Sequence, residues 1–565
     1  MKTLLKNGVV VNVFTGELEQ ANVLIADEKI VGVGEYSEKD AELVRDVGGK
    51  YICPGFIDGH IHIESTLLLP AEFARVVVPH GTTSVMTDPH EIANVCGGQG
   101  ISFMLAASEA IPLTMYVLLP SCVPATAFDE SGARLGAEDL EAFYDHPRVL
   151  GLAEMMNYPG VIAGDPQVME KIAAAHRRNL VVNGHAPLLS GKDLDRYIAA
   201  GIGDDHECSS LEEAQERIRK GQRVMIRQGT AAPNLADLLP LFDEPWAHRC
   251  LLVSDDKHPA DLLNDGHIDD IIRRAVAAGK SAVTGIRMAT LWAAECFGLK
   301  DIGAIAPGYT ADILVLDDLQ TVAVRDVYRR GVPVVKDGKL LDFEMPAIPP
   351  GLKNTVYHSF HMQEVSAADF QVDAHSQRKC RVIRLLPGQL ITEEWIADID
   401  FDKNGGIDTE GDILKIAVLE RHQHTGHIGL GFITGTGLKS GAIASSVSHD
   451  SHNLIVIGAK ETDMAVAANR VRMMGGGSVV VKEGEILSEM PLPIGGVMGN
   501  VPAGVIAAQN ERLRESVHAL GVPQNVEPFM SMAFVSLPVI PHLKITTKGL
   551  VDVDKQKRVP LFADA

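Results

Sequence analysis

The sequence has no closely spaced cysteines and no long apolar run. Its seven cysteines are scattered over 565 residues, without a Cys-x-x-Cys pair. This excludes a disulfide framework and indicates a reducing compartment, so we expect a cytoplasmic protein. The first residues lack the apolar stretch and cleavage site of a signal peptide, and no later run reaches about 18 uncharged apolar residues. We therefore expect no membrane partner.

Basic residues are also scarce. The chain has 51 Lys and Arg residues against 74 Asp and Glu residues, which gives a formal net charge of −23. This charge argues against nucleic acids and anionic membranes as partners, and a small neutral or cationic substrate fits it better. The length suggests three or four domains, a number that one large barrel would lower.

The pattern of apolar and polar residues changes near residue 56. Residues 1–55 alternate apolar and polar positions with Gly punctuation, which predicts short antiparallel strands. Eight short apolar or β-branched runs follow, starting about 21 to 35 residues apart, near the length of a βα unit. They predict a closed (β/α)8 barrel. The runs are 56–62, 83–87, 113–119, 148–154, 180–185, 201–206, 223–227 and 250–254.

The remaining segments complete an α/β architecture. Residues 302–345 show the same short, strand-like pattern as the first 55 residues. We therefore expect 1–55 and 302–345 to form one small composite β-sandwich domain. The TIM-like barrel is expected to span 56–301. A Pro-rich linker near residue 346 then predicts a separate C-terminal α+β domain over 346–565.

Polar residues fall at the ends of the predicted strands. Asp58, His60 and His62 alternate within the first run, so on a strand they share one face. The carboxyl ends of barrel strands meet at one mouth, where such folds carry their chemistry. Six residues there form a set suited to two divalent metals, with Glu154 as the bridge. The predicted ligands are His60, His62, Glu154, His185, His206 and Asp255.

Each of these residues also has an ordinary structural explanation. His185 and His206 alone would suit hydrogen-bonded core histidines, and Asp88 or Asp255 alone would suit a helix cap. The arrival of six such residues at strand ends is what favours a metal centre.

The chain resembles the amidohydrolase superfamily, and most closely its bacterial adenine deaminases. The resemblance rests on the motifs PGFIDGHIHIES (54–65), TDPHEIANV (87–95) and GLAEMMN (151–157). It continues through 183–187, 205–207, 254–256 and 303–316 into the C-terminal domain. The first motif is shared across the superfamily, whereas the second and third are more specific to adenine deaminases. The resemblance implies metal-dependent hydrolysis of adenine to hypoxanthine and ammonia in purine salvage.

One residue type distinguishes this chain from other binuclear amidohydrolases. Hydantoinase-like and dihydroorotase-like enzymes bridge two metals through a carboxylated lysine on strand four. This chain has no lysine between Lys50 and Lys171, so Glu154 must serve as the bridge if the site is binuclear. The same absence counts against a hydantoinase and leaves a mononuclear deaminase as the alternative.

The expected mechanism follows from the predicted ligand set. A metal lowers the pKa of water, and the resulting hydroxide attacks C6 of the purine. Asp255 is the candidate that accepts the proton while also touching a metal, and Asp256 is its rival because strand alternation turns only one of them inward. Imidazole and carboxylate ligands suit Mn, Fe or Zn, and the resemblance favours Mn²⁺ or Fe²⁺.

Further residues are expected around the pocket. His90 and Glu91 are predicted to polarise the substrate or orient the water, although a helix starting after Pro89 would also explain them. Asp88 and Glu207 are expected to contact substrate, with an exposed loop carboxylate as the alternative for Glu207.

The C-terminal domain carries a histidine-rich region, 420–453. His449, Asp450 and Ser451 are predicted to cover a barrel mouth and bind substrate, with a polar turn network at an interface as the alternative. The apolar, Gly-rich domain also favours a homo-oligomer, most simply a dimer. The rival functions are deamination of another amino- or N6-substituted purine, a cyclic amidohydrolase, and a non-catalytic scaffold.

Overall fold

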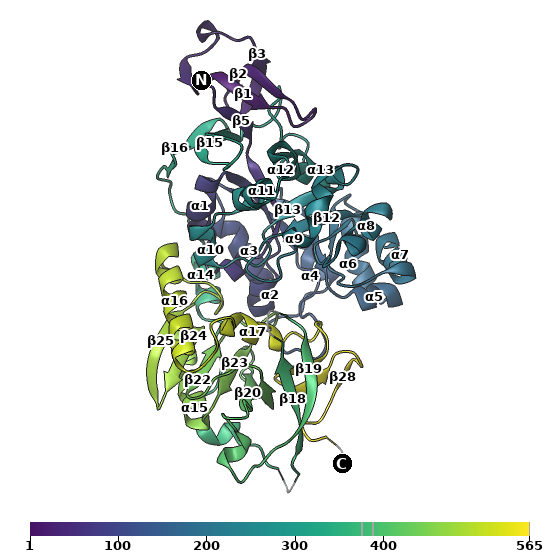
Figure 1. Cartoon of the computed structure of the whole chain (residues 1–565), viewed down its shortest axis with the longest axis vertical. Helices are drawn as coiled ribbons and strands as arrows, with labels where there is room; N and C mark the ends of the chain where they lie inside the picture. The colour runs from purple at the N-terminus through teal and green to yellow at the C-terminus, as the bar shows by residue number, and fades with distance from the viewer. Residues whose placement is uncertain (375–376, 387–388, 564–565) are drawn as a thin grey trace.

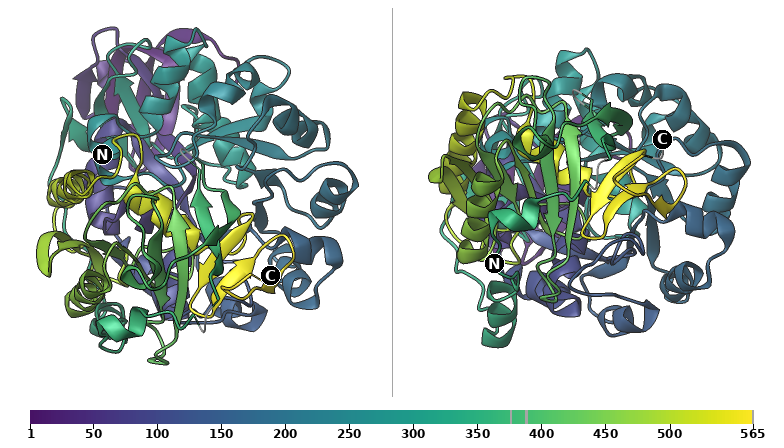
Figure 2. Two further views of the ribbon diagram at one scale, coloured as in Figure 1. Left: turned by 60° about the horizontal axis from the view of Figure 1, so that its bottom comes forward. Right: turned by 90° about the horizontal axis from the view of Figure 1, so that it is seen from below.

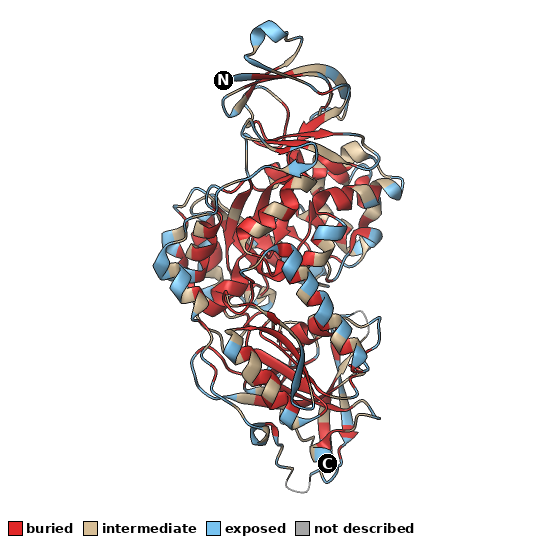
Figure 3. Ribbon diagram, turned by 90° about the vertical axis from the view of Figure 1, so that its left-hand side faces the viewer, coloured by how far each residue is buried: buried red, intermediate tan, exposed pale blue. Residues whose placement is uncertain are grey.

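The computed structural model describes residues 1–374, 377–386 and 389–563, arranged in three regions along the long axis of the molecule (Figure 1). A β-rich region with the N-terminus lies at one end, a parallel-stranded region lies in the middle, and the C-terminal region lies at the other end. Buried residues concentrate on the strands of the middle and C-terminal regions (Figure 3). Within the described residues, no helix combines the length and apolarity needed to cross a membrane.

Strands from both flanks of the middle region share one nine-stranded sheet. Its link is β5 (Tyr51–Pro54), which pairs in parallel with β1 and antiparallel with β14. Buried side chains such as Ile52 and Ile313 form its core. The other strands are β1 (Lys2–Val11), β2 (Leu18–Ala26), β3 (Lys29–Gly34), β4 (Leu43–Asp46), β14 (Ile313–Leu316), β15 (Val324–Arg329), β16 (Val332–Lys336) and β17 (Lys339–Leu340).

The middle region is a curled parallel sheet, and each of the eight predicted runs overlaps one of its strands. Five strands are ordered β10-β9-β8-β7-β6 and three are ordered β11-β12-β13. Backbone hydrogen bonds join the two sets at both ends, from Gly203 N to Val182 O (3.0 Å) and from Asp255 N to His60 O (2.9 Å). The strands are β6 (Phe56–Ile61), β7 (Thr82–Thr87), β8 (Thr114–Leu119), β9 (Val149–Met155), β10 (Val181–Gly184), β11 (Asp204–Asp205), β12 (Arg223–Arg227) and β13 (Cys250–Val253).

Helices between these strands follow from amphipathic spacing and capping. In α11 (Ile268–Ala277), Ile268, Ile271 and Ile272 are fully buried, and burial of one such side chain contributes about 1.5–3 kcal/mol. Asp165 caps α6 (Pro166–His176) by accepting hydrogen bonds from two backbone N–H groups of its first turn.

The other helices of this region are α1 (Pro70–Val77), α2 (His90–Cys96), α3 (Gly98–Ala107), α4 (Ala137–Leu140), α5 (Tyr158–Ala163), α7 (Gly191–Ala199), α8 (Leu211–Arg219), α9 (Leu235–Leu238), α10 (Pro259–Asn264), α12 (Ala282–Met288) and α13 (Leu291–Cys296).

The C-terminal region is built on an eight-stranded sheet with the order β19-β18-β21-β20-β23-β22-β24-β25. Helices α15 (Glu461–Met474) and α16 (Ala503–Ala519) lie along one side, and the small sheet β26-β27-β28 lies on the other (Figure 2). Helix α17 (Pro528–Val535) faces the middle region.

The remaining elements of the C-terminal region are α14 (Pro350–Tyr357), β18 (Lys379–Leu385), β19 (Thr392–Asp398), β20 (Leu414–Leu419), β21 (Ile428–Thr434), β22 (Ala442–Ser445), β23 (Leu454–Gly458), β24 (Gly477–Lys482), β25 (Glu485–Pro491), β26 (Leu543–Thr546), β27 (Gly549–Asp552) and β28 (Lys557–Arg558).

Candidate metal centre

The first strand of the curled sheet presents two histidines to a common centre. The His60 and His62 rings are 4.8 Å apart between centroids. Asp58, on the same face, instead accepts hydrogen bonds from the backbone and hydroxyl of Ser254, and its Oδ2 lies 3.0 Å from His267 Nε2. Asp58 therefore ties β6 to the end of β13, while the two histidines remain free to act at the mouth.

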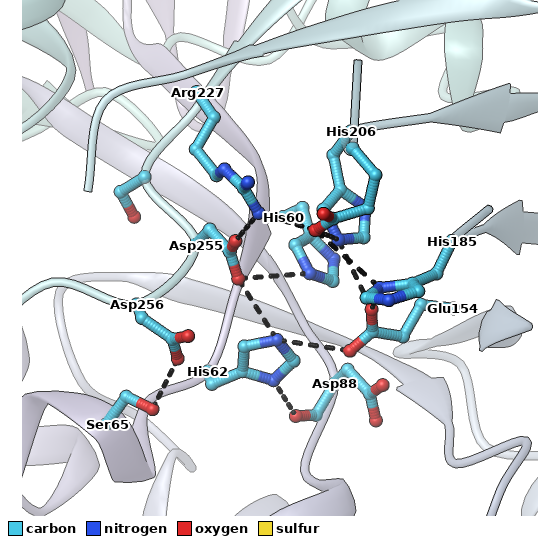
Figure 4. Close-up of polar contacts among 12 residues, drawn as sticks. His60, His62, Ser65, Asp88, Glu154, His185, His206, Arg227, Asp255 and Asp256 are labelled. Carbon is cyan, nitrogen blue, oxygen red and sulfur yellow. Dashed lines mark hydrogen bonds and ion pairs between the residues drawn. The ribbon is translucent and has the colours of Figure 1, made fainter. Parts of the chain in front are cut away.

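Glu154 lies between histidines from different strands (Figure 4). Its Oε1 is 3.3 Å from His62 Nε2. Its Oε2 is 2.6 Å from His185 Nδ1 and 3.2 Å from His206 Nε2. One carboxylate thus faces both sides of the cluster, the arrangement that a bridging ligand requires.

Asp255 closes the other side of the cluster. Its Oδ1 lies 3.2 Å from His62 Nε2 and 3.5 Å from His60 Nε2. His62 donates a hydrogen bond from Nδ1 to the carbonyl of Asp88 (3.1 Å), which leaves the Nε2 lone pair directed at the cluster.

The donor atoms fit divalent metal ions. Neither ring nitrogen of His60 has a hydrogen-bond partner among the described residues, and His206 Nδ1 has none either. Buried polar atoms without partners are costly, so such atoms indicate a missing ligand. Among the described residues, five groups hold ligand atoms that all lie within 4.8 Å of one another, and three of them consist of predicted ligands with or without Glu207. These are His60/His62/Asp255, His60/Glu154/His206 and His185/His206/Glu207.

The two central carboxylates are ionised at neutral pH. Burial raises the pKa of Glu154, but the charge of His185 and hydrogen bonds with His185 and His206 hold it well below its ordinary value. Burial also raises the pKa of Asp255, and the Arg227 guanidinium together with His60 and His62 hold it well below that of a free aspartate. Deprotonated carboxylates are the form that binds metals.

Arg227, at the end of β12, was not foreseen as a site residue. Its Nη1 lies 2.5 Å from Asp255 Oδ2 and 2.6 Å from Glu207 Oε1. The charge of Arg227 lowers the pKa of Glu207, against the effect of burial. An arginine ending a buried strand at the same mouth was the available signal, because buried arginines require partners.

The expectation that only one of Asp255 and Asp256 faces inward is wrong, because both line the pocket. Strand β13 ends at Val253 and Asp255 has a φ of +56°, in the left-handed region, so strand alternation does not extend over Asp255 and Asp256. Asp256 Oδ1 accepts a hydrogen bond of 2.6 Å from Ser65 Oγ. The same hydroxyl lies 2.6 Å from Glu91 Oε1, and burial raises the pKa of Glu91 to about 8. Ser65 has one proton, so one of these carboxyls must be protonated for both contacts to be hydrogen bonds.

The cluster forms the floor of a pocket of about 390 Å³. Its inner wall includes His90 and Glu91 at the start of α2, together with Glu207. The C-terminal region supplies His449 and Asp450. The outer wall is apolar and comes from both regions, through Leu188, Leu189, Leu390, Ile391, Phe534 and Ile540.

Two of the predicted substrate contacts do not line this pocket. The Asp88 carboxylate instead lies 3.0 Å from His90 Nδ1 and orients that ring. Ser451 accepts a hydrogen bond from His422 Nε2 at its carbonyl (2.7 Å) and one from Asn453 at its hydroxyl (3.2 Å). Both residues lie behind the pocket wall, where Asp88 Oδ1 has no hydrogen-bond partner among the described residues.

Comparison with known families gives one match to the N-terminal part of the chain and one match to the C-terminal region. Residues 51–341 match the amidohydrolase family, and residues 389–557 match the adenine deaminase C-terminal domain. The class of protein that the fold and the site define is therefore an amidohydrolase with this additional domain.

Relatives cover almost the whole length. The adenine deaminase of Desulfatibacillum aliphaticivorans is 47% identical over 561 residues, which cover 99% of this chain and 97% of that protein. Adenine deaminase 2 of Carboxydothermus hydrogenoformans is 46% identical over 561 residues, covering 99% and 96%. The adenine deaminase of Brucella anthropi is 46% identical over 554 residues, covering 98% and 96%. The chain belongs to the adenine deaminase family.

Proposed function

We propose that this chain is a metal-dependent aminohydrolase that converts adenine and water to hypoxanthine and ammonia in purine salvage. The observation that carries the proposal is the Glu154-centred cluster on the floor of a pocket large enough for a purine. The family assignment supports it, because full-length relatives carry the name adenine deaminase.

The same proposal includes the domain architecture. The eight parallel strands form one (β/α)8 barrel over 56–301, supported by the backbone hydrogen bonds at both seams. Residues 1–55 with 302–345 form a composite β domain, and 346–565 form the C-terminal domain that walls the pocket. We also expect a cytoplasmic homodimer.

Two divalent ions would be held by imidazole and carboxylate ligands. His60, His62 and Asp255 face one side of Glu154, and His185 and His206 face the other. When bound, such ions act as Lewis acids that lower the pKa of water. Donors of this type without thiolates favour Mn²⁺ or Fe²⁺, with Zn²⁺ as the alternative. A lysine bridge has no support, because the Lys171 ammonium donates to the Ser121 carbonyl (2.7 Å).

Asp255 is assigned the proton-accepting role. Arg227 occupies its Oδ2, so Oδ1 is the atom that faces the metal ligands and the attacking water. Glu91 keeps its proton at neutral pH and would donate it toward the purine ring or the departing amine. His90 Nε2 lies 3.7 Å from Asp450 Oδ1, and both side chains line the pocket, where they can position the purine ring.

The apolar outer wall favours a second candidate substrate class. A cavity of about 390 Å³ leaves room beyond a purine ring next to Leu188 and Ile391. Purines with an apolar N6 substituent would fit the same chemistry, with an alkylamine as the leaving group.

The test is amine release by enzyme reconstituted with Mn²⁺ or Fe²⁺ and by chelated enzyme. Adenine, N6-substituted purines and cyclic amides are compared as substrates. We expect metal-dependent turnover that is highest with adenine. Turnover of only another panel member would replace the substrate, and no turnover of any member by metal-loaded enzyme would contradict an enzymatic function.

A further inference from the structure

A second and smaller cavity adjoins the catalytic pocket. This side chamber measures about 40 Å³ and lies between the β6–α1 connection and the C-terminal region. Its polar wall includes Ser65, Ser445 of β22, Ser478 of β24 and Asn510 of α16. Three side chains line both cavities and form the wall between them: Asp256, His449 and Phe534.

The dividing wall is built from ordered contacts. The His449 ring stacks on Phe534, with centroids 4.5 Å apart and planes at 20°. Asp256 is fixed at 2.6 Å from Ser65 Oγ. The side chamber therefore begins directly behind a carboxylate that faces the reacting molecule.

The size of the side chamber selects its ligand. A cavity needs about 10–15 Å³ to hold one water molecule, so about 40 Å³ admits a molecule of that size. A purine ring system is several times larger than a water molecule and is excluded. The occupant is therefore a small molecule of one or two heavy atoms.

The lining of the side chamber offers hydrogen bonds to an occupant. Asn510 is only 6% exposed, yet no described residue forms a hydrogen bond with its side-chain amide. Ser445 Oγ and Ser478 Oγ are 2.9 Å apart and share one hydrogen bond, which leaves further capacity on both hydroxyls. The Asn510 amide therefore keeps hydrogen-bonding capacity at the chamber, which a small polar ligand can use.

We propose that the side chamber binds the ammonia released from adenine while hypoxanthine still occupies the catalytic pocket. The inference rests on the proposed function. In that reaction the C6–N6 bond breaks, the water oxygen becomes the C6 carbonyl oxygen, and N6 leaves as ammonia. Ammonia has the size of water and offers three donors and one acceptor. It can donate to Asp256 and to Asn510 Oδ1 and accept from Asn510 Nδ2, which matches this lining.

The experiment is inhibition of adenine turnover by ammonium chloride at saturating adenine, with tetramethylammonium chloride at equal ionic strength as the salt control. If ammonia has its own site beside the occupied pocket, ammonium inhibits even when adenine is saturating, and tetramethylammonium does not. Asn510→Leu removes the amide at similar volume and is expected to weaken ammonium inhibition severalfold. Arg512→Leu, an exposed change on the same helix, is expected to leave it at the wild-type level.

Ser478→Val provides a second variant on a different element, and thermal melting and metal content verify that each variant is folded. Equal ammonium inhibition in wild type, Asn510→Leu and Ser478→Val would overturn the proposal, as would absence of inhibition in wild type. Turnover of adenine without added ammonium tests the proposed function separately. Calorimetric titration of ammonium chloride into wild type and Asn510→Leu tests the side chamber without turnover, and equal or absent heats in both would also overturn it.

Discussion

Arg227 Nη1 lies 2.5 Å from Asp255 Oδ2, so the other carboxylate oxygen of Asp255 is left to face His60 and His62. The same guanidinium holds Glu207 at 2.6 Å. Arg227→Met would leave two buried carboxylates without their cation and free Asp255 to rotate. Because a small misplacement of a catalytic group costs about 100-fold in rate, we expect kcat/KM for adenine to fall by about that factor.

Steady-state kinetics and metal analysis check this prediction. The matched control is Arg223→Met at the other end of β12, where the side chain bonds the His248 carbonyl away from the pocket. Arg227→Lys keeps the charge but lacks the planar guanidinium. Its kcat/KM for adenine should lie between the values of wild type and Arg227→Met. A wild-type rate in Arg227→Met would show that Asp255 does not depend on the guanidinium.

Glu154→Gln removes the charge that faces histidines on both sides of the cluster. A neutral amide cannot replace a bridging carboxylate, so both bound metal and activity should be lost. Metal content after mild purification, measured beside turnover, is the direct readout. Glu141→Gln, a change at an exposed position of the same region, should retain both. Full metal content in Glu154→Gln would remove the bridging role.

Much of the middle region was predictable because local pattern decides it. Alternation in 56–62 and apolar runs elsewhere placed the eight strands to within a few residues, and strand ends of a parallel sheet necessarily meet. The six predicted ligands do lie together, although their roles remain a prediction. This success depends on short-range periodicity.

Other parts of the site depend on long-range packing, which a single sequence does not reveal. The pairing of Arg227 with Asp255 joins two strands, and the positive φ of Asp255 breaks the alternation on which the expectation for Asp256 relied. The outer wall formed by Leu390 and Phe534 comes from residues far along the chain from the strands that they cover. These features arise from contacts between distant parts of the chain and leave no local sequence pattern.

Asp255→Asn and Asp256→Asn separate two neighbouring carboxylates that both reach the pocket. Asp255 faces two predicted metal ligands, whereas Asp256 bonds Ser65. If Asp255 accepts the proton, Asp255→Asn should keep much of the metal while kcat collapses, because Glu154 and the histidines remain. Asp256→Asn should retain more kcat than Asp255→Asn. The reverse order of kcat values, with metal content equal, would transfer the proton-accepting role to Asp256.

Lys544 is buried, and no carboxylate of the described residues pairs with it. Its ammonium donates to the carbonyls of Leu390 (3.0 Å) and Phe534 (3.2 Å), two residues of the pocket wall. Burial lowers its pKa from 10.5 to about 7. Between those pH values the unfolded chain binds a proton that the folded chain does not, so folding stability rises with pH; below about pH 7 the full cost of burying the charge is present. Lys544→Met should therefore raise the melting temperature, and the gain should be larger at pH 6 than at pH 9. Lys557→Met, at an exposed position of β28, is the control. Its melting temperature at both pH values shows the effect of removing a lysine charge from the surface. An equal gain at both pH values would mean that Lys544 titrates as an ordinary lysine.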